Sequence, residues 1–298
     1  MTQIIKPSAA DLLIHHVSEK PKWLIYGICG VVTVFAWGWL ITMTAGISSF
    51  VLAPTLGPGM QVLQPFLDTI AETINQSSWL TLFVKFCTPQ ASVGANFAIF
   101  MGTFFMWCAM SFAMMLPSAL PMLRTYSEIS ETAGKQNRKT VPTYILALGY
   151  FSIWIGFSLL AATSQMMLVE LGWAKDTILP IGNLLAGMLL VTAGLYQFSP
   201  LKEACLHKCR NPFTTLFGHW SEDPVRIYRL GLKQGLYCLG CCWALMLIML
   251  VVGTMNLAWM AFLTIFALVE KTGKGKVTSR TFAVILLLWG GILISLSL

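Results

Sequence analysis

The residues best suited to chemistry in this sequence are five cysteines in two short clusters, one of which encloses a histidine. The six residues are Cys205, His207, Cys209, Cys238, Cys241 and Cys242. On a helix, the i, i+4 spacing of the first two thiols puts both sulfurs on one face. Thiolates bind Zn²⁺, Cu(I) and iron–sulfur centres, and two motifs of two cysteines supply the ligands of a four-coordinate site. The pattern predicts a metal site in which His207 is an additional ligand.

The surroundings of the second cluster favour one metal. Cys241 and Cys242 run directly into Trp243 and a long apolar segment, whereas structural zinc sites usually lie in polar loops. An apolar setting rich in sulfur suits Cu(I) better than Zn²⁺, although zinc also fits the ligand types. The competing interpretation is that cysteine is a small residue that is often buried in helices.

The composition indicates what kind of molecule positions these residues. Hydrophobic residues make up 56% of the 298, and charged residues only 10%. Several apolar stretches approach the ~20 residues that a helix needs to cross a bilayer. The sequence therefore predicts an all-α, polytopic bundle of transmembrane helices. The net charge of +7 does not indicate nucleic-acid binding, because the basic residues lie in the loops between apolar stretches.

The apolar stretches predict seven spans within a single domain, residues 23–298, preceded by a polar segment, residues 1–22. Six spans result if residues 236–270 cross only once. Residues 48–94 form a long loop with an interfacial helix over Val62–Ile74, and Pro117 and Pro121 close the second span. The predicted spans are 23–47, 95–116, 144–171, 178–198, 236–253, 255–270 and 281–298.

The basic residues predict the orientation of the bundle. With these spans, all of the 19 Lys and Arg residues except Lys85 and Lys175 fall on the side of the N-terminus. Cytoplasmic loops carry such an excess, so a cytoplasmic N-terminus is expected. Both cysteine clusters then lie at the cytoplasmic side.

Several chemistries have no support in the sequence. It contains no G-x-x-x-x-G-K-[ST] phosphate loop and no plausible Ser, His and Asp constellation. The carboxylate of Glu270 lies at the end of a span and is followed by Lys271. These absences argue against ATP-driven pumping, hydrolysis and proton-coupled transport, and no enzymatic activity is predicted. Met106, Met110 and Met114 recur at i, i+4 and i+8 and could pass Cu(I), although methionine also fills gaps in helix bundles.

Four separated motifs carry a resemblance to a known family. They are Met106 to Pro117; Gly149, Tyr150, Trp154 and Gln165; Tyr196 to Pro212; and Gly240 to Lys271. Together these motifs resemble a bacterial family of uncharacterised, predicted metal-binding integral membrane proteins, catalogued as a domain of unknown function. The resemblance covers about residues 95–271. It implies a multi-pass protein of the bacterial cytoplasmic (inner) membrane that binds a metal, and it leaves the activity open.

Three functions are compatible with these features. The first is a metal-handling protein that binds Cu(I) at the two clusters for delivery, efflux or metalloenzyme assembly, with a metallochaperone as a possible partner. The second is a non-catalytic subunit or assembly partner of a membrane enzyme complex, packed against other subunits in the lipid bilayer. The third is a thiol–disulfide redox protein in which Cys238 and Cys241 form an exchangeable pair.

Overall fold

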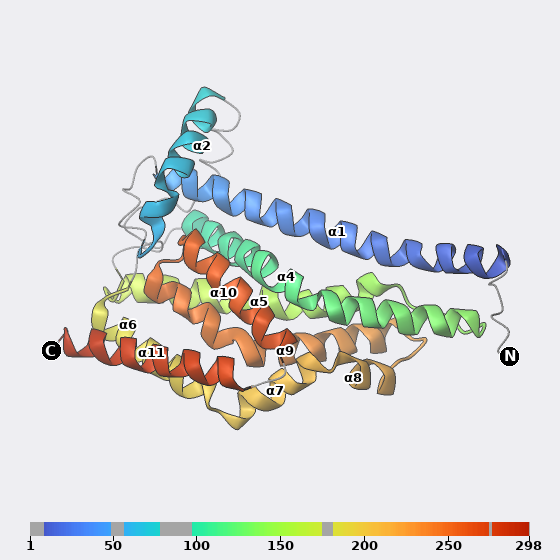
Figure 1. Ribbon diagram of the computed structural model, residues 1–298. Coiled ribbons are helices and arrows are strands. Elements are labelled where there is room, and N and C mark those ends of the chain that lie inside the picture. Colours follow the sequence, from blue (N-terminus) through green and yellow to red (C-terminus); the bar gives the residue numbers. More distant parts are fainter. Residues whose placement is uncertain (1–8, 49–56, 78–96, 175–180, 274–275, 298) are drawn as a thin grey trace, which may run out of the picture.

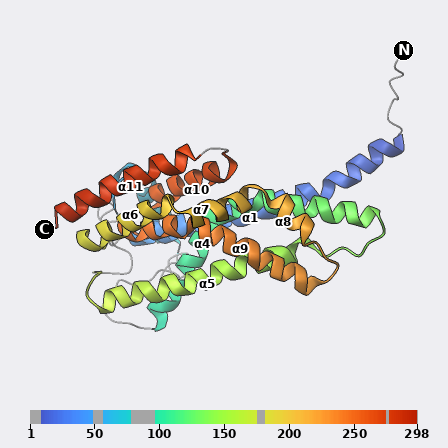
Figure 2. The same cartoon turned by 90° about the horizontal axis from the view of Figure 1, so that it is seen from below.

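The computed structural model describes residues 9–48, 57–77, 97–174, 181–273 and 276–297, and within them all regular structure is helical. The all-α prediction is therefore confirmed. The long helices lie side by side and run roughly along one direction (Figures 1 and 2). The elements are α1 (Ala9–Ser48), the 3-10 helix η2 (Met60–Leu63), α2 (Gln64–Gln76), α4 (Phe97–Lys135), α5 (Thr143–Glu170), α6 (Asn183–Gln197), α7 (Pro200–Arg210), α8 (Pro212–Gly218), α9 (Pro224–Val252), α10 (Leu257–Thr272) and α11 (Val277–Ser295).

Five of these helices are long and apolar enough to cross a membrane, namely α1 over Ile25–Ile47, α4, α5, α9 and α11. α6 and α7 qualify only together, and they are bent by 63° at the break between them, so the number of such spans is six at most. α10, with 16 residues, is not among them. The expected count of seven crossings remains a prediction.

The course of α4 differs from the expected one. Pro117 and Pro121 were expected to close the second span, but α4 continues through both prolines to Lys135, so that prediction is wrong. A proline at position 117 has no N–H for the carbonyl of Ala113, four residues earlier. The indole Nε1 of Trp37 in α1 donates to that carbonyl oxygen at 3.2 Å instead. A side chain from the neighbouring helix thus replaces the missing backbone donor, and the helix persists.

The apolar stretch after residue 236 is broken where the small and polar residues occur. α9 ends at Val252, and Gly253 has a φ of 97°, a conformation that favours glycine. The side chain of Asn256 accepts a hydrogen bond from the backbone N–H of Trp259 at 3.1 Å and so caps α10. α10 therefore folds back along α9, and its last turn returns to the level of the cysteines.

The segment between α1 and α4 is described only in part. The expected interfacial helix over Val62–Ile74 is helical, as η2 and α2. Residues 49–56 and 78–94 of the predicted loop, and residues 95–96 of the predicted second span, lie outside the described residues.

α5 and α9 make the closest helix contact near the cysteines. A Cβ on Gly149 would lie 2.2 Å from the carbonyl oxygen of Tyr228, and a Cβ on Gly231 would lie 2.2 Å from that of Leu146. The two backbones therefore touch at these glycines, as is common where helices pack in membranes. This contact positions Tyr150, the residue after Gly149, against α9.

We expect Gly149→Ala to lower the free energy of unfolding by about 1–3 kcal/mol, because the added methyl group overlaps backbone atoms that cannot move independently. Denaturant-induced unfolding in detergent measures the change. Gly156→Ala is the matched control in the same helix, since a Cβ there meets no atom within 4 Å. Equal stability of the two variants would contradict the close contact.

Candidate metal site

Three thiols gather on the buried face of α9. Cys238, Cys241 and Cys242 occupy positions i, i+3 and i+4 of one helix, which places them on the same side. Their sulfur atoms all lie within 4.8 Å of one another, and all three residues are buried. The Sγ atoms of Cys241 and Cys242 are 3.3 Å apart, and the thiol of Cys241 donates to the carbonyl oxygen of Cys238 at 3.1 Å. Within the described residues, this is the one group of three such ligands.

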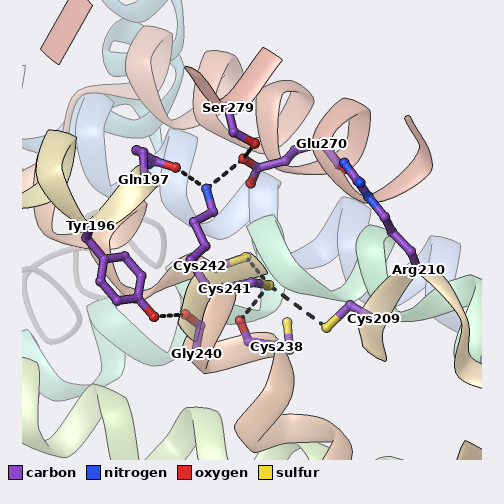
Figure 3. Close-up of polar contacts among 11 residues, drawn as sticks. Tyr196, Gln197, Cys209, Arg210, Cys238, Gly240, Cys241, Cys242, Glu270 and Ser279 are labelled. Atoms are coloured by element: carbon purple, nitrogen blue, oxygen red, sulfur yellow. Dashed lines mark hydrogen bonds and ion pairs between the residues drawn. The ribbon is translucent and has the colours of Figure 1, made fainter. Parts of the chain in front are cut away.

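A fourth thiol comes from α7. The chain turns at Ser199, whose side chain accepts a hydrogen bond from the backbone N–H of Leu201 and so caps α7, with Pro200 at the first helical position. This bend lays α7 across α9, and the Sγ of Cys209 lies 3.9 Å from the Sγ of Cys241 (Figure 3). The structure thus brings thiols of both sequence clusters together.

The other two predicted ligands, Cys205 and His207, are not part of the group of three thiols. Cys205 is half-buried and packs on Gly240, where an added Cβ would lie 2.6 Å from its sulfur. The hydroxyl of Tyr196 also donates to the carbonyl oxygen of Gly240. His207 is exposed and lies about 200° around α7 from Cys205. There it lines an open cavity of about 120 Å³ together with Glu203 and Arg280.

A lysine and a tyrosine contact the sulfur of Cys238. The Nζ of Lys271, at the end of α10, donates to this Sγ at 3.0 Å and to the hydroxyl of Ser118 in α4 at 2.7 Å. The hydroxyl of Tyr150 in α5 donates to the same sulfur at 2.9 Å. Hydrogen bonds and a positive charge stabilise a thiolate, the form of cysteine that binds metals. α5 and α10 therefore contact Cys238 of α9 directly, and α4 joins them through Lys271.

A buried ion pair lies next to the thiols (Figure 3). Lys202 of α7 and Glu270 of α10 are 2% and 1% exposed, and their Nζ and Oε1 atoms are 2.6 Å apart. Gln197 accepts a further hydrogen bond from Lys202, and Ser279 of α11 donates one to Glu270. The guanidinium of Arg210 donates to the backbone carbonyl of Glu270 at 3.0 and 2.7 Å. This network ties α7, and with it Cys209, to α10 and α11.

Sequence reasoning did not identify Lys202, Lys271 or Tyr150 as parts of this region. Lys202 was expected in a solvated loop, and Lys271 was noted only as the neighbour of Glu270. A signal was present, however, because a charged residue at the end of an apolar helix is costly unless it is paired or functional. The partner could not be identified in this way, because Lys202 and Glu270 lie 68 positions apart and no rule of local spacing connects them.

The arrangement is suited to a soft metal ion. With metal–sulfur bonds of about 2.3 Å, two sulfurs on one ion stand no more than ~4.6 Å apart. The three α9 sulfurs, within 4.8 Å of one another, are close to this range, and Cys209 lies within it of Cys241. Apart from Lys271, Tyr150 and the adjacent ion pair, the α9 thiols belong to a core of buried apolar side chains such as Leu245 and Met246. Sulfur ligands in an apolar environment favour Cu(I) over hard cations such as Mg²⁺.

A family model described as "PpoB2: Copper chaperone" matches residues 104–293. The matched range contains every thiol and every charged residue of the region described above. No curated protein and no solved structure matches the chain.

Proposed function

The chain belongs to the PpoB2 family of copper chaperones, and from this premise we propose that it is an integral membrane protein that binds Cu(I) and passes it on. The proposed ligands are Cys209, Cys238, Cys241 and Cys242. The observation that carries the proposal is that the α7 thiol of Cys209 lies 3.9 Å from Cys241, one of three buried α9 thiols whose sulfurs lie within 4.8 Å of one another. The set does not include Cys205, which packs against Gly240, or His207, which is exposed on the other side of α7.

Copper is favoured over zinc by the ligand set. Structural zinc takes four ligands in a closed tetrahedron, typically in polar loops. Here three of the thiols belong to one continuous turn of a buried helix, and only one comes from a second helix. Cu(I) accepts fewer sulfur ligands than Zn²⁺ needs, and an ion held by two or three of these thiols retains a path for exchange.

The location follows from the apolar helices and the distribution of charge. We place the protein in the bacterial cytoplasmic membrane with its N-terminus in the cytoplasm, since 17 of 19 basic residues fall on that side in the predicted topology. The thiols then lie near the cytoplasmic side of the bundle. A thiol-rich donor, such as a soluble metallochaperone, is the partner expected there.

Elemental analysis of the purified protein tests the proposal. We expect close to one copper per chain after anaerobic loading in detergent, and less than a tenth of that in the Cys238→Ser, Cys241→Ser, Cys242→Ser variant. Cys29→Ser and Cys108→Ser are the controls, because these free cysteines lie in α1 and α4. Retention of copper by the triple variant would exclude these ligands, and stoichiometric zinc in place of copper would indicate a structural zinc site.

A further inference from the structure

Buried methionines extend the sulfur-rich region away from the thiols. Within the described residues, eleven methionines are buried, and all but Met122 are at most 2% exposed. They belong to one contiguous core that also contains Cys238, Cys241 and Cys242. They are Met43, Met60, Met106, Met110, Met114, Met115, Met122, Met246, Met249, Met255 and Met260.

Two hydrogen-bonding contacts fix how the helices carrying these methionines are aligned. Lys271 contacts both Cys238 and Ser118, which sets α10, α9 and α4 at one common level. Trp37 contacts the carbonyl of Ala113, which aligns α1 with α4. Each residue adds about 1.5 Å along a helix, so positions on the four helices can be compared by counting from these contacts.

Counted in this way, the methionines fall into successive layers. Met114 and Met115 lie three or four residues from the level of Cys238, and Met110 and Met246 both lie eight residues away. The next layer, eleven or twelve residues away, combines one methionine from each of α1, α4, α9 and α10. Its members are Met43, Met106, Met249 and Met260.

The series reaches the far end of the bundle. Met255 lies in the turn between α9 and α10, and Met60 begins η2 beside it, where Pro58 accepts a hydrogen bond from the side chain of Asn256. Successive layers are three to five residues apart, about 4.5–7.5 Å along the helices. A long thioether side chain spans much of such an interval.

This layering suits transfer of a soft monovalent cation. Thioethers bind Cu(I) and have little affinity for hard cations. They carry no charge, so they hold Cu(I) less tightly than thiolates, and an ion can leave each layer for the next. The alternative explanation is that methionines fill gaps in the core because their side chains are flexible. Gap filling accounts for single methionines, but it does not require one methionine from each of four helices at the same level.

We propose that the layered methionines form a path for Cu(I) between the thiol cluster and the opposite end of the bundle. The inference rests on the proposed function, because the thiols load the path. At each step a Cu–S bond to the next thioether forms while a bond to the previous sulfur breaks. Copper remains Cu(I), and no electron is transferred. The thiolates left behind take up protons or the next Cu(I) ion.

The test uses the full chain reconstituted into vesicles of phosphatidylethanolamine and phosphatidylglycerol that contain a membrane-impermeant Cu(I) chelator. Cu(I) is added outside with ascorbate under anaerobic conditions, and formation of the coloured chelate inside is followed. We expect the Met110→Leu, Met246→Leu, Met249→Leu variant to slow this uptake at least tenfold while it retains the copper content of the wild type. Leucine conserves side-chain volume, so the core is expected to remain folded.

Met167→Leu, Met188→Leu is the matched control, because these methionines are 61% and 47% exposed on the outside of the bundle. It is expected to transfer Cu(I) at the wild-type rate. Wild-type uptake no faster than that of protein-free vesicles, or undiminished uptake by the triple variant, would overturn the path while leaving copper binding intact. Absence of bound copper in the wild type would instead refute the proposed function. Single variants such as Met249→Leu replace the triple if it does not fold.

Discussion

Replacing Glu270 with glutamine is expected to lower the free energy of unfolding by about 3–5 kcal/mol, as observed when one partner of a buried ion pair is removed. The carboxylate is 1% exposed and lies 2.6 Å from the Nζ of Lys202, which is itself 2% exposed. The variant leaves this ammonium in the protein interior without an opposite charge. Denaturant-induced unfolding in detergent, followed by tryptophan fluorescence, measures the loss.

Two further variants separate the buried pair from salt bridges in general. Glu222→Gln removes a partner of Arg138 in a pair whose side chains are 54% and 40% exposed, and its effect is expected to be much smaller. The double variant Lys202→Met, Glu270→Leu removes both charges and should recover most of the stability. If Glu270→Gln unfolds at the wild-type denaturant concentration, the ion pair does not hold α7 against α10.

The second large effect is expected for copper affinity. Lys271→Gln should weaken Cu(I) binding by about 10–100-fold, the range typical of partners that contact a metal ligand. Cu(I) bound by two or three thiolates carries a net negative charge, which is costly in an apolar interior unless a cation lies beside it. The Nζ of Lys271 is 3.0 Å from the sulfur of Cys238 and is the cation in that position. Glutamine retains a hydrogen-bond donor, so the comparison isolates the charge.

Competition with a colorimetric Cu(I) chelator measures this affinity. Lys208→Gln is the control, because it removes the same charge from an exposed residue of α7 on the outside of the same region. Its copper affinity should equal that of the wild type. An unchanged affinity in Lys271→Gln would show that the ammonium does not balance the charge of the metal–thiolate group.

The helices were largely predictable because the apolar stretches and their breaks are local features of the sequence. The break at Gly253 and Asn256 is an example, since a glycine with positive φ and a capping asparagine act over a few residues. The continuation of α4 through Pro117 was not predictable, because it depends on the indole of Trp37, which is 76 positions away from the carbonyl that it contacts. The local sequence shows that Pro117 lacks a backbone N–H donor, but it does not show that the indole of Trp37 replaces this donor.

The candidate site shows the same division. The i, i+4 spacing predicted that the two thiols of α7 share a face, and the three thiols of α9 were recognised as a cluster. Both members of that pair contact α9, and the bend at Ser199 and Pro200 decides which of them reaches a thiol. That Cys209 lies against Cys241 and Cys205 against Gly240 therefore required the structure. The position of Lys271 beside Cys238 depends on α10 folding back after Gly253 far enough to return to the level of the cysteines. This is a property of the assembled pair of α9 and α10.

The ion pair of Lys202 also bears on the order in which the protein is made. The ribosome produces α7 and the four thiols before residue 270, and the groups that complete their environment follow: Glu270, Lys271 and then Ser279 of α11. Until α10 and α11 have been inserted, Lys202 lacks its carboxylate and Cys238 lacks its ammonium. A nascent chain therefore contains the thiols without the charges that balance them, and we expect its affinity for copper to be lower than that of the complete chain until α10 and α11 have been made.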